Sequence, residues 1–376
     1  MVELKCILLA RQGPADDAGI IQDHLLELEE LARSCNMLPV GNHRLRRTLI
    51  DPRTYYGSGQ LRAVLDDARN LGASHLICDD ELSGGQVRNI EKITGLVAMD
   101  RTGLILTIFE QRAQTREARA QVELARYEYE LPRLKGAWTH LERQVGGVGI
   151  RGGPGEKQIE VDRRMTRLRI KQLKQELEHL ERIHQTQRGG RLPDLPRVSL
   201  VGYTNAGKTT LLRALTGEGE PKNMLFATLD TTTRKAWLGN DESTGMPKHA
   251  LISDTVGFIR KLPHQLVAAF RSTLGEVRAA NALLVVTDAA HPELDEHLKV
   301  VGATLKEIGC RDHPRLLVLN QADRLTRPKR LDLQRRYPNA AIISALDKTS
   351  VDEVRSWLTE LIPGPPKPRE LEWWEL

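Results

Sequence analysis

The sequence predicts an α/β protein in three parts: a small α/β subdomain, a long antiparallel helical hairpin and a P-loop domain. Strand-like and helix-like segments alternate over residues 1–109, which favours a parallel sheet. Residues 110–189 contain two long, charged segments with apolar residues at helical spacing. A phosphate-loop signature follows an apolar run near residue 200. We therefore assign residues 190–362 to the P-loop domain and residues 363–376 to a tail containing Pro and Trp.

Residues 1–109 are predicted to form alternating short strands and amphipathic helices. Apolar runs at residues 4–9, 37–40, 74–78 and 96–99 predict strands. Residues 18–32, 61–71 and 87–93 have helical spacing. This order predicts a parallel sheet with its connecting helices packed against it.

The composition narrows the class of protein. Hydrophobic residues make up 40% of the 376 residues, enough to fill more than one core. No apolar run is long enough to span a membrane, and the N-terminus lacks a signal-peptide pattern, so we expect a cytoplasmic protein. The four cysteines form no C-x-x-C pair, which argues against a zinc site or a disulfide framework. A net charge of +5 is compatible with a nucleic-acid partner.

Two long helices and a basic, glycine-rich tip are predicted for the hairpin. Residues 110–129 place Ala118, Val122, Ala125 and Tyr129 on one stripe, and Pro132 ends that helix. Residues 157–187 form the second helix, and the loop at 133–156 forms the tip. The seam of the second helix is spaced three and four residues apart, at Thr166, Ile170, Leu173, Leu177, Leu180 and His184.

The phosphate loop follows the apolar residues 198–201 and opens a helical pattern at 210–215. This strand–loop–helix context makes the signature G-x-x-x-x-G-K-[ST] specific for phosphate binding. Lys208 is predicted to reach the outer phosphates, and the Thr209 hydroxyl to bind Mg²⁺. The predicted phosphate contacts are Gly202, Tyr203, Thr204, Asn205, Ala206, Gly207, Lys208, Thr209 and Thr210.

A second metal and phosphate element follows the apolar residues 250–252. Asp254 stands where a carboxylate holds Mg²⁺ through water, and Gly257 lets the backbone approach the third phosphate. Between the two elements, a loop threonine must reach Mg²⁺ and the γ-phosphate if that loop is a switch. Spacing and a resemblance to known GTPases favour Thr228, with residues 231–233 as competitors. The predicted metal ligands are therefore Thr209, Thr228 and Asp254.

A third element separates GTP from ATP. Asn320 to Asp323 follows a strongly apolar run and occupies the position of the base-reading N-K-x-D sequence. A carboxylate at Asp323 can accept hydrogen bonds from the ring N–H and the exocyclic amine of guanine together, and adenine lacks that pair of donors. Asn320 would brace the neighbouring loops. Ser344 and Ala345 follow another strand and resemble the backbone contact to the guanine carbonyl.

These motifs, with segments 100–106, 136–143, 146–164, 201–208 and 254–264, closely resemble the HflX family of ribosome-associated GTPases over residues 55–362. The resemblance implies an N-terminal α/β subdomain, a helical hairpin and a GTPase domain that use GTP, GDP and Mg²⁺. It also implies binding to the large (50S) ribosomal subunit, with the hairpin loop near the peptidyl-transferase centre, and splitting or rescue of ribosomes under stress. Longer relatives carry a further C-terminal domain, which we do not expect here. We expect a monomer.

The hairpin carries basic and aromatic residues that suit ribosomal RNA. A solvated helix face explains the charges of the two shafts equally well, and the tip is the better candidate. The predicted RNA contacts are Arg133, Lys135, Trp138, Arg143, Arg151, Arg163 and Arg164.

Phe258 and Asn205 bear on the rate of hydrolysis. Phe258 replaces the glutamine that orients water in many GTPases, so we expect slow intrinsic turnover with no certain catalytic side chain. Lys208, Thr228 and Gly257 would then be the transition-state and switch contacts. Asn205 resembles the asparagine of GTPases that recruit K⁺, which makes potassium a second candidate cofactor.

The base-reading element departs from its pattern at Gln321, where most GTPases have lysine. We expect nucleotide affinity to fall by about 1–2 kcal/mol if one charged hydrogen bond is lost, with specificity kept by Asp323.

Two other functions remain open. The hairpin could bind a non-ribosomal protein, with the seam at 166–184 as a docking surface. Residues 56–60 could mark a second nucleotide site in the N-terminal subdomain, although a surface turn explains them as well.

Overall fold

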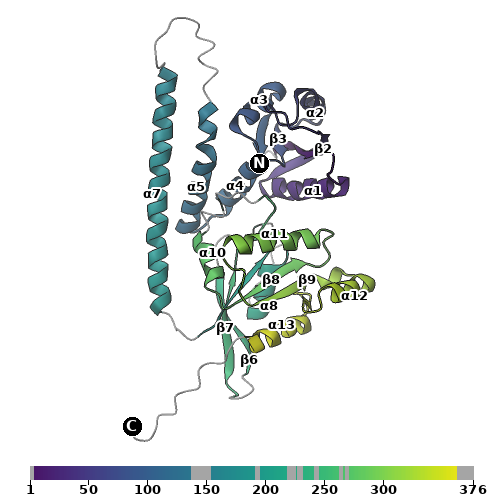
Figure 1. Cartoon of the computed structure of the whole chain (residues 1–376), viewed down its shortest axis with the longest axis vertical. Coiled ribbons are helices and arrows are strands. Elements are labelled where there is room, and N and C mark those ends of the chain that lie inside the picture. Colours follow the sequence, from purple (N-terminus) through teal and green to yellow (C-terminus); the bar gives the residue numbers. More distant parts are fainter. Residues whose placement is uncertain are drawn as a thin grey trace, which may run out of the picture. The chain divides into compact units, whose positions relative to one another are not determined.

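The computed structural model describes residues 4–136, 154–190, 195–217, 226, 232–240, 245–261, 266 and 271–361 (Figure 1). They fall into two compact units. One comprises Met1–Leu180 with Pro263–Ala269, and the other comprises Glu181–Leu262 with Phe270–Leu376. The described residues include no helix that is both long and apolar enough to cross a membrane.

The first unit is built on a four-stranded parallel sheet in the order β2-β1-β3-β4. Two of its helices begin at side-chain caps: Asp17 caps α1, and Ser83 with Gln86 forms a capping box on α3. The parallel sheet predicted from alternating segments is therefore present. The elements are β1 (Leu4–Gln12), α1 (Ala18–Ser34), β2 (Met37–Arg46), α2 (Ser58–Leu71), β3 (His75–Cys78), α3 (Gly84–Thr94) and β4 (Val97–Asp100).

A separate helix, α4 (Arg101–Arg112), precedes the hairpin and was not predicted. The helix expected over residues 110–129 is wrong at its start, because the chain leaves α4 at Ala113 and α5 (Arg116–Glu130) begins at the Thr115 cap. The Thr115 hydroxyl accepts a hydrogen bond from Ala118 N, which satisfies one open donor of the new helix. A short 3₁₀ helix, η1 (Arg133–Gly136), follows α5.

Helices α5 and α7 (Pro154–Gly190) pack against each other within the first unit (Figure 1). The packing residues are Ala120, Leu124 and Tyr127 from α5 with Ile170, Leu173 and Leu177 from α7. The predicted seam on the second helix is thus correct at these three positions. The stripe predicted on the first helix faces elsewhere: Tyr129 Oη donates to Asp100 Oδ1 at 2.6 Å, which ties that face of α5 to the end of β4.

The second unit is a six-stranded sheet in the order β10-β9-β8-β5-β7-β6, in which β6 alone runs antiparallel. Strands β6 and β7 pair antiparallel as a hairpin. The strands are β5 (Arg197–Gly202), β6 (Thr232–Asn240), β7 (Pro247–Asp254), β8 (Ala282–Asp288), β9 (Arg315–Asn320) and β10 (Ala341–Ile342). The helices are α8 (Lys208–Thr216), α10 (Arg271–Arg278), α11 (Leu294–Glu307), η2 (Ala322–Arg324), α12 (Arg327–Arg336) and α13 (Lys348–Leu361).

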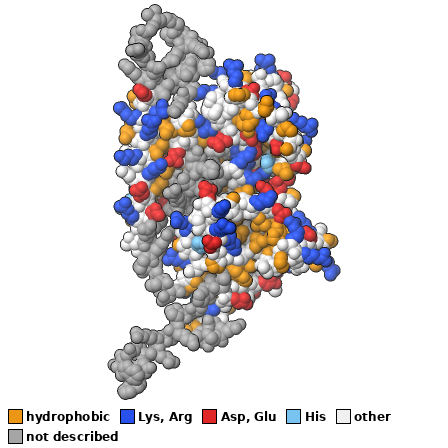
Figure 2. All heavy atoms as spheres, viewed as in Figure 1, with side chains coloured by type: hydrophobic (Ala, Val, Ile, Leu, Met, Phe, Trp, Pro, Cys, Tyr) orange, Lys and Arg blue, Asp and Glu red, His pale blue; other side chains and the backbone are white. Residues whose placement is uncertain are grey.

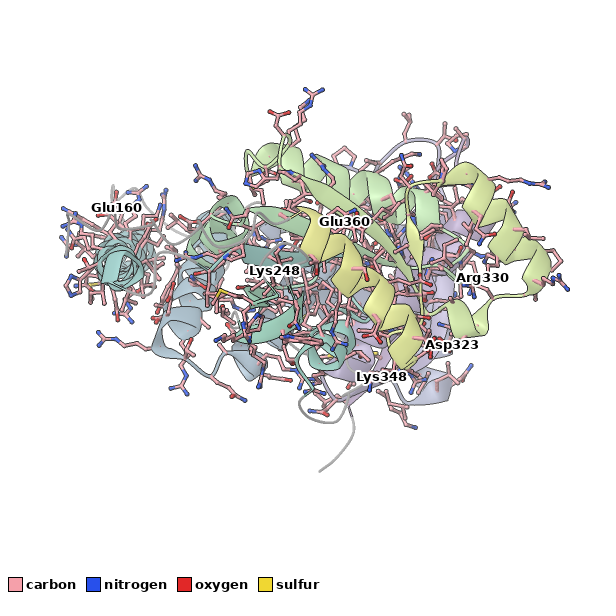
Figure 3. All side chains as sticks on the ribbon, turned by 90° about the horizontal axis from the view of Figure 1, so that it is seen from below. Glu160, Lys248, Asp323, Arg330, Lys348 and Glu360 are labelled. Atoms are coloured by element: carbon pink, nitrogen blue, oxygen red, sulfur yellow. The ribbon has the colours of Figure 1, made fainter. Side chains whose placement is uncertain are left out.

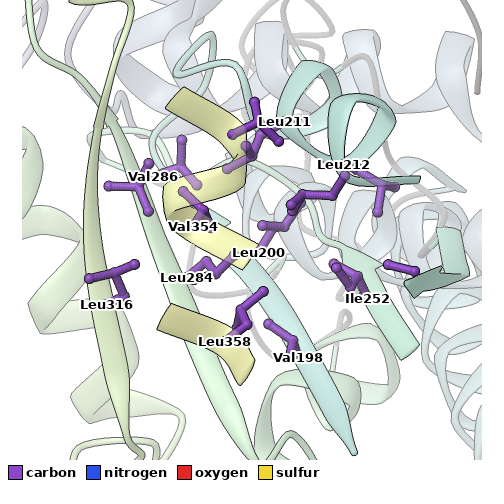
Figure 4. Close-up of a cluster of buried hydrophobic side chains, with 14 of the residues drawn as sticks. Val198, Leu200, Leu211, Leu212, Ile252, Leu284, Val286, Leu316, Val354 and Leu358 are labelled. Atoms are coloured by element: carbon purple, nitrogen blue, oxygen red, sulfur yellow. The ribbon is translucent and has the colours of Figure 1, made fainter. Parts of the chain in front are cut away.

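An apolar core holds the central strands of this unit against α8 and α13 (Figure 4). Leu200 on β5, Leu211 on α8 and Val354 on α13 are all fully buried. Burial of such side chains contributes about 1.5–3 kcal/mol each to folding. The core therefore fixes the carboxyl end of β5 and the start of α8, where the phosphate loop lies.

Candidate guanine-nucleotide site

Two glycines shape the loop between β5 and α8. A Cβ atom at Gly202 would lie 1.9 Å from the carbonyl oxygen of Val286 on the neighbouring strand. Gly207 has a φ of +87°, and a Cβ there would lie 2.2 Å from Asn320 Nδ2. The loop can therefore contact both β8 and the loop after β9 only with glycine at these positions.

Lys208 lies inside the phosphate loop. Its Nζ donates to the carbonyl oxygens of Gly202 at 3.1 Å and Tyr203 at 2.8 Å. Burial lowers the pKa of Lys208 to about 8, and the charge of Asp254 opposes that shift. The lysine is thus a buried cation held by backbone carbonyls, and phosphate oxygens would supply the counter-charge that these dipoles only partly provide.

Two of the three predicted metal ligands, Thr209 and Asp254, lie together. Thr209 Oγ1 donates to Asp254 Oδ2 at 2.6 Å, so the first turn of α8 meets the end of β7. A hydroxyl and a carboxylate are hard oxygen donors of the kind Mg²⁺ prefers, and Mg²⁺ commonly uses one or two protein ligands with phosphates and water. The donor set therefore fits the ion. Thr228 and Thr231 lie outside the described residues. Thr232 and Thr233 belong to β6.

The segment after β7 is joined to the phosphate loop by backbone hydrogen bonds. Phe258 N donates to Gly202 O at 2.9 Å, and Thr204 N donates to Phe258 O at 2.8 Å. The side chain of Phe258 is 2% exposed and cannot orient a water molecule. At Gly257, an added Cβ would lie 2.9 Å from Thr204 Cα and 3.0 Å from Lys208 Nζ, so only glycine allows this close approach.

Asn320 joins the phosphate loop to the base-reading loops. Its Nδ2 donates to Ala206 O and its Oδ1 accepts from Ala345 N, each at 2.9 Å. Ser344 Oγ donates to Asp323 Oδ1 at 2.7 Å, which orients that carboxylate (Asp323 is labelled in Figure 3). Residues from the ends of β5, β9 and β10 therefore meet at one edge of the sheet.

Gln321 also contacts the phosphate loop. Its Nε2 donates to Asn205 O at 3.1 Å, so the shorter, uncharged side chain still spans the gap. Its Oε1 accepts from Arg324 Nη1, which also lies 3.2 Å from Asp288 Oδ2. Sequence reasoning missed Arg324 and Asp288, because neither belongs to the N-K-x-D signature.

The predicted RNA contacts are placed only in part. Arg133 Nη2 donates to Leu82 O and to the buried Asp100 carboxylate, and the guanidinium lies 3.4 Å from the centre of the Tyr129 ring. Arg133 therefore takes part in the framework of the first unit. Arg163 and Arg164 lie on α7, where Figure 2 shows Lys and Arg side chains at the surface. Lys135 lies in η1. Trp138, Arg143 and Arg151 lie outside the described residues.

Known proteins share this chain's organisation. Three family descriptions match it: "GTP-binding GTPase N-terminal" at residues 22–110, "GTP-binding GTPase Middle Region" at 112–191 and "50S ribosome-binding GTPase" at 197–321. The GTPase HflX of Flavobacterium psychrophilum is 46% identical over 305 residues, which cover 81% of this chain and 71% of that protein. The chain belongs to the HflX family of GTPases.

Other HflX relatives agree over a longer alignment. The GTPase HflX of Escherichia coli (strain K12) is 41% identical over 346 residues, covering 91% of this chain and 80% of that protein. A crystal structure of the SsGBP–GDP complex aligns with a TM-score of 0.52 and 26% identity, covering 95% of this chain and 98% of that one. The predicted family, the P-loop GTPase fold and the enzyme class are therefore confirmed.

Proposed function

We propose that this HflX-family GTPase binds GTP with Mg²⁺, hydrolyses it slowly, and associates with the 50S ribosomal subunit through its helical hairpin. The two hydrogen bonds of Asn320, to Ala206 and Ala345, carry the nucleotide part of the proposal. They hold the phosphate loop and the base-reading loop in one arrangement, so a single guanine nucleotide can contact both. The match of residues 197–321 to a 50S ribosome-binding GTPase family supports the ribosomal part.

The third phosphate is the feature that distinguishes GTP from GDP in this site. A Cβ added at Gly257 would lie against Thr204 and Lys208, so this backbone runs close to Lys208 and its N–H would be available to that phosphate. Thr228 would add its hydroxyl to the Mg²⁺ shell set by Thr209 and Asp254. Loss of the phosphate would remove both contacts and release the segments around Thr228 and Gly257.

Hydrolysis depends mainly on electrostatics in this site. Lys208 and Mg²⁺ would stabilise charge on the transferred phosphoryl group, and the buried Phe258 leaves the attacking water without a side-chain guide from that position. Turnover by the free protein is therefore slow. A binding partner that orders the segments around Thr228 and Gly257 and orients the attacking water would accelerate hydrolysis. The proposed partner is the ribosome.

Exposed basic side chains on α7 supply the charge for an RNA surface. Arg164, Arg167, Lys171 and Lys174 are exposed, and Lys174 also pairs with Glu128 at 2.8 Å. Cations spaced along a helix suit a phosphate backbone. The tip residues Trp138, Arg143 and Arg151 would add stacking and phosphate contacts to ribosomal RNA. Splitting or rescue of stressed ribosomes is the proposed outcome.

Co-sedimentation with purified 50S subunits tests this function. We expect the full chain to pellet with 50S in a non-hydrolysable GTP analogue and to be largely released in GDP. Asp323→Asn serves as the matched control, because an amide presents an N–H to the base and so weakens guanine while favouring xanthine. That variant should bind 50S with a xanthosine triphosphate analogue only. Equal pelleting in all nucleotides, or none, would contradict the proposal.

An alternative function has one specific observation in its favour. Val161, Met165 and Leu168 are exposed large apolar residues at helical spacing on α7. Such a stripe is typical of a face that docks onto another protein. Nucleotide-dependent binding to a non-ribosomal protein, with no 50S binding in the experiment above, would support this alternative.

Potassium dependence is a separate proposal. Asn205 adopts a left-handed φ of +60° in the phosphate loop, and its side chain would help to hold a K⁺ ion beside the phosphates. GTP hydrolysis should then be faster in KCl than in NaCl, and Asn205→Ala should abolish the difference. Equal rates in the two salts would remove potassium from the mechanism.

A further inference from the structure

We propose that Arg324 is a positioning residue that makes Gln321 a working substitute for the lysine of the N-K-x-D element. This inference rests on the guanine-nucleotide site proposed above. It assigns a role to a residue outside the known signature, in a chain whose signature is altered.

The geometry forms one continuous chain of hydrogen bonds. Ala290 N donates to Asp288 Oδ1 at 2.7 Å, which fixes the carboxylate at the end of β8. Asp288 Oδ2 accepts from Arg324 Nη1 at 3.2 Å, and the same nitrogen donates to Gln321 Oε1 at 2.5 Å. Gln321 Nε2 then donates to Asn205 O in the phosphate loop at 3.1 Å.

The orientation of the carboxamide follows from the donors and acceptors available. A guanidinium can only donate, so it pairs with the amide oxygen of Gln321. The amide nitrogen must then point the other way, where the Asn205 carbonyl can only accept. Without Arg324, the carboxamide could turn over and place its oxygen against that carbonyl, which would be repulsive. A lysine at position 321 would need no such partner, because every proton of its ammonium is a donor.

Arg324 also restores positive charge to this corner of the site. Gln321 removes one positive charge relative to the usual lysine, and Arg324 returns one three residues later. The backbone supports this placement: Arg324 N donates to Gln321 O at 3.0 Å, which closes one turn of η2. Gln321 itself has a φ of +62°, which turns its side chain out of the strand path. Asp288 is 14% exposed, so its ion pair with Arg324 is partly shielded from water.

A mutant cycle on GDP binding tests the proposal. Arg324→Gln should weaken binding of a fluorescent GDP analogue by about three- to tenfold, the range for one charge-assisted hydrogen bond at a partly exposed site. In the Gln321→Lys background the same change should alter affinity less than about twofold, because lysine needs no orienting partner. Arg324→Lys, in the otherwise wild-type protein, should keep part of the GDP affinity that Arg324→Gln loses. Arg335→Gln, an equal loss of charge from the exposed part of α12, should have little effect in either background.

The outcomes separate this inference from the proposed function. If wild-type protein fails to select guanine over adenine nucleotides, the proposed site is wrong and the inference falls with it. If selection holds but Arg324→Gln has equal effects in the wild-type and the Gln321→Lys backgrounds, Arg324 acts only through general charge or structure, and the inference alone is overturned. Thermal unfolding of each variant distinguishes a lost contact from a lost fold.

Discussion

The rings of Tyr203 and His297 stack with their centroids 3.7 Å apart and their planes 7° from parallel. Tyr203 belongs to the phosphate loop and His297 to α11, and Tyr203 Oη also accepts a hydrogen bond from Arg260 N at 2.9 Å. One tyrosine therefore joins the phosphate loop, the segment after β7 and a helix that carries none of the predicted nucleotide contacts. The ring centroid of His291 lies 4.2 Å from that of His297.

The buried imidazole of His297 predicts a specific pH dependence of stability. Burial, with the nearby His291 and Arg260, lowers the pKa of His297 from 6.5 to about 3. Below pH 6.5 the imidazole is protonated in the unfolded chain but stays neutral in the folded chain until the pH nears 3. The free energy of unfolding is therefore unaffected by this group above pH 6.5 and decreases as the pH drops from 6.5 toward 3. We expect the melting temperature to decrease over that window. His297→Phe, which keeps an aromatic ring in the stack, should flatten the slope.

The matched control for this experiment is His179→Phe, which removes an exposed histidine from α7. It should leave the slope unchanged. If the melting temperature depends on pH equally in wild type and His297→Phe, this imidazole does not cause the loss of stability at low pH.

The lowered pKa of Lys208 predicts that the protein takes up protons when it binds nucleotide. Burial lowers the pKa of this lysine to about 8, and bound phosphate oxygens would raise it. At a pH about half a unit above that value, calorimetry in buffers of different ionisation enthalpy should detect net proton uptake on GDP binding, and affinity should fall as the pH rises further. In Lys208→Met the uptake should disappear along with most of the affinity. Uptake of the same size in wild type and variant would assign the proton to another group.

The close packing at Gly257 predicts that a substitution there slows GTP hydrolysis more than it weakens GDP binding. Gly257→Ala forces a Cβ against Thr204 Cα and Lys208 Nζ, in the segment that we propose contacts the third phosphate. A misplacement of this kind can cost about 100-fold in rate, so GTP turnover should fall far more than GDP affinity. Gly302→Ala is the control, because nothing lies within 4 Å of a Cβ at that position of α11. It should keep activity and stabilise the protein by about 0.5–1 kcal/mol. Similar losses in both variants would count against a special role for Gly257.

The α5–α7 pairing predicts that apolar contacts outweigh ion pairs. Leu173 is 1% exposed among Ala120 and Leu124, so Leu173→Ala should lower the free energy of unfolding by about 2–4 kcal/mol. Arg169 pairs with both oxygens of Glu123 at 2.8 Å, but the two side chains are 42% and 37% exposed. Arg169→Gln should therefore cost less than about 1 kcal/mol. Denaturant unfolding of the two variants gives the comparison, and a larger loss for Arg169→Gln would reverse this ranking.

Much of the fold was predictable, and the main omission has a physical reason. The strands and helices of the first sheet show clear periodicity, as does the seam of α7. Helix α4 does not, because eight of its residues, from Arg101 to Phe109, are buried. A helix buried on most sides loses the alternation of apolar and polar faces by which a sequence reveals it. The start of α5 was misplaced for the same reason, since residues 110–112 belong to the preceding helix.

The candidate residues of the nucleotide site were predicted from local patterns in the sequence. Gly202, Gly207, Lys208 and Thr209 lie in one short segment from the end of β5 to the start of α8, where local geometry limits the residues that can serve. Asp254 and Asp323 follow apolar strands, and the carboxyl ends of parallel strands meet at one edge of a sheet. Strand order therefore carried these predictions across long separations in sequence.

Tertiary structure alone decided the supporting contacts. Three such contacts join residues whose spacing has no period or signature. They are the stack of Tyr203 on His297, the hydrogen bonds from Asp288 through Arg324 to Gln321, and the contacts of Arg133 with Asp100 and Tyr129. Such contacts depend on side-chain directions at the ends of separately folded elements. Those directions are set only when the sheets and helices pack, because packing determines which donor faces which acceptor.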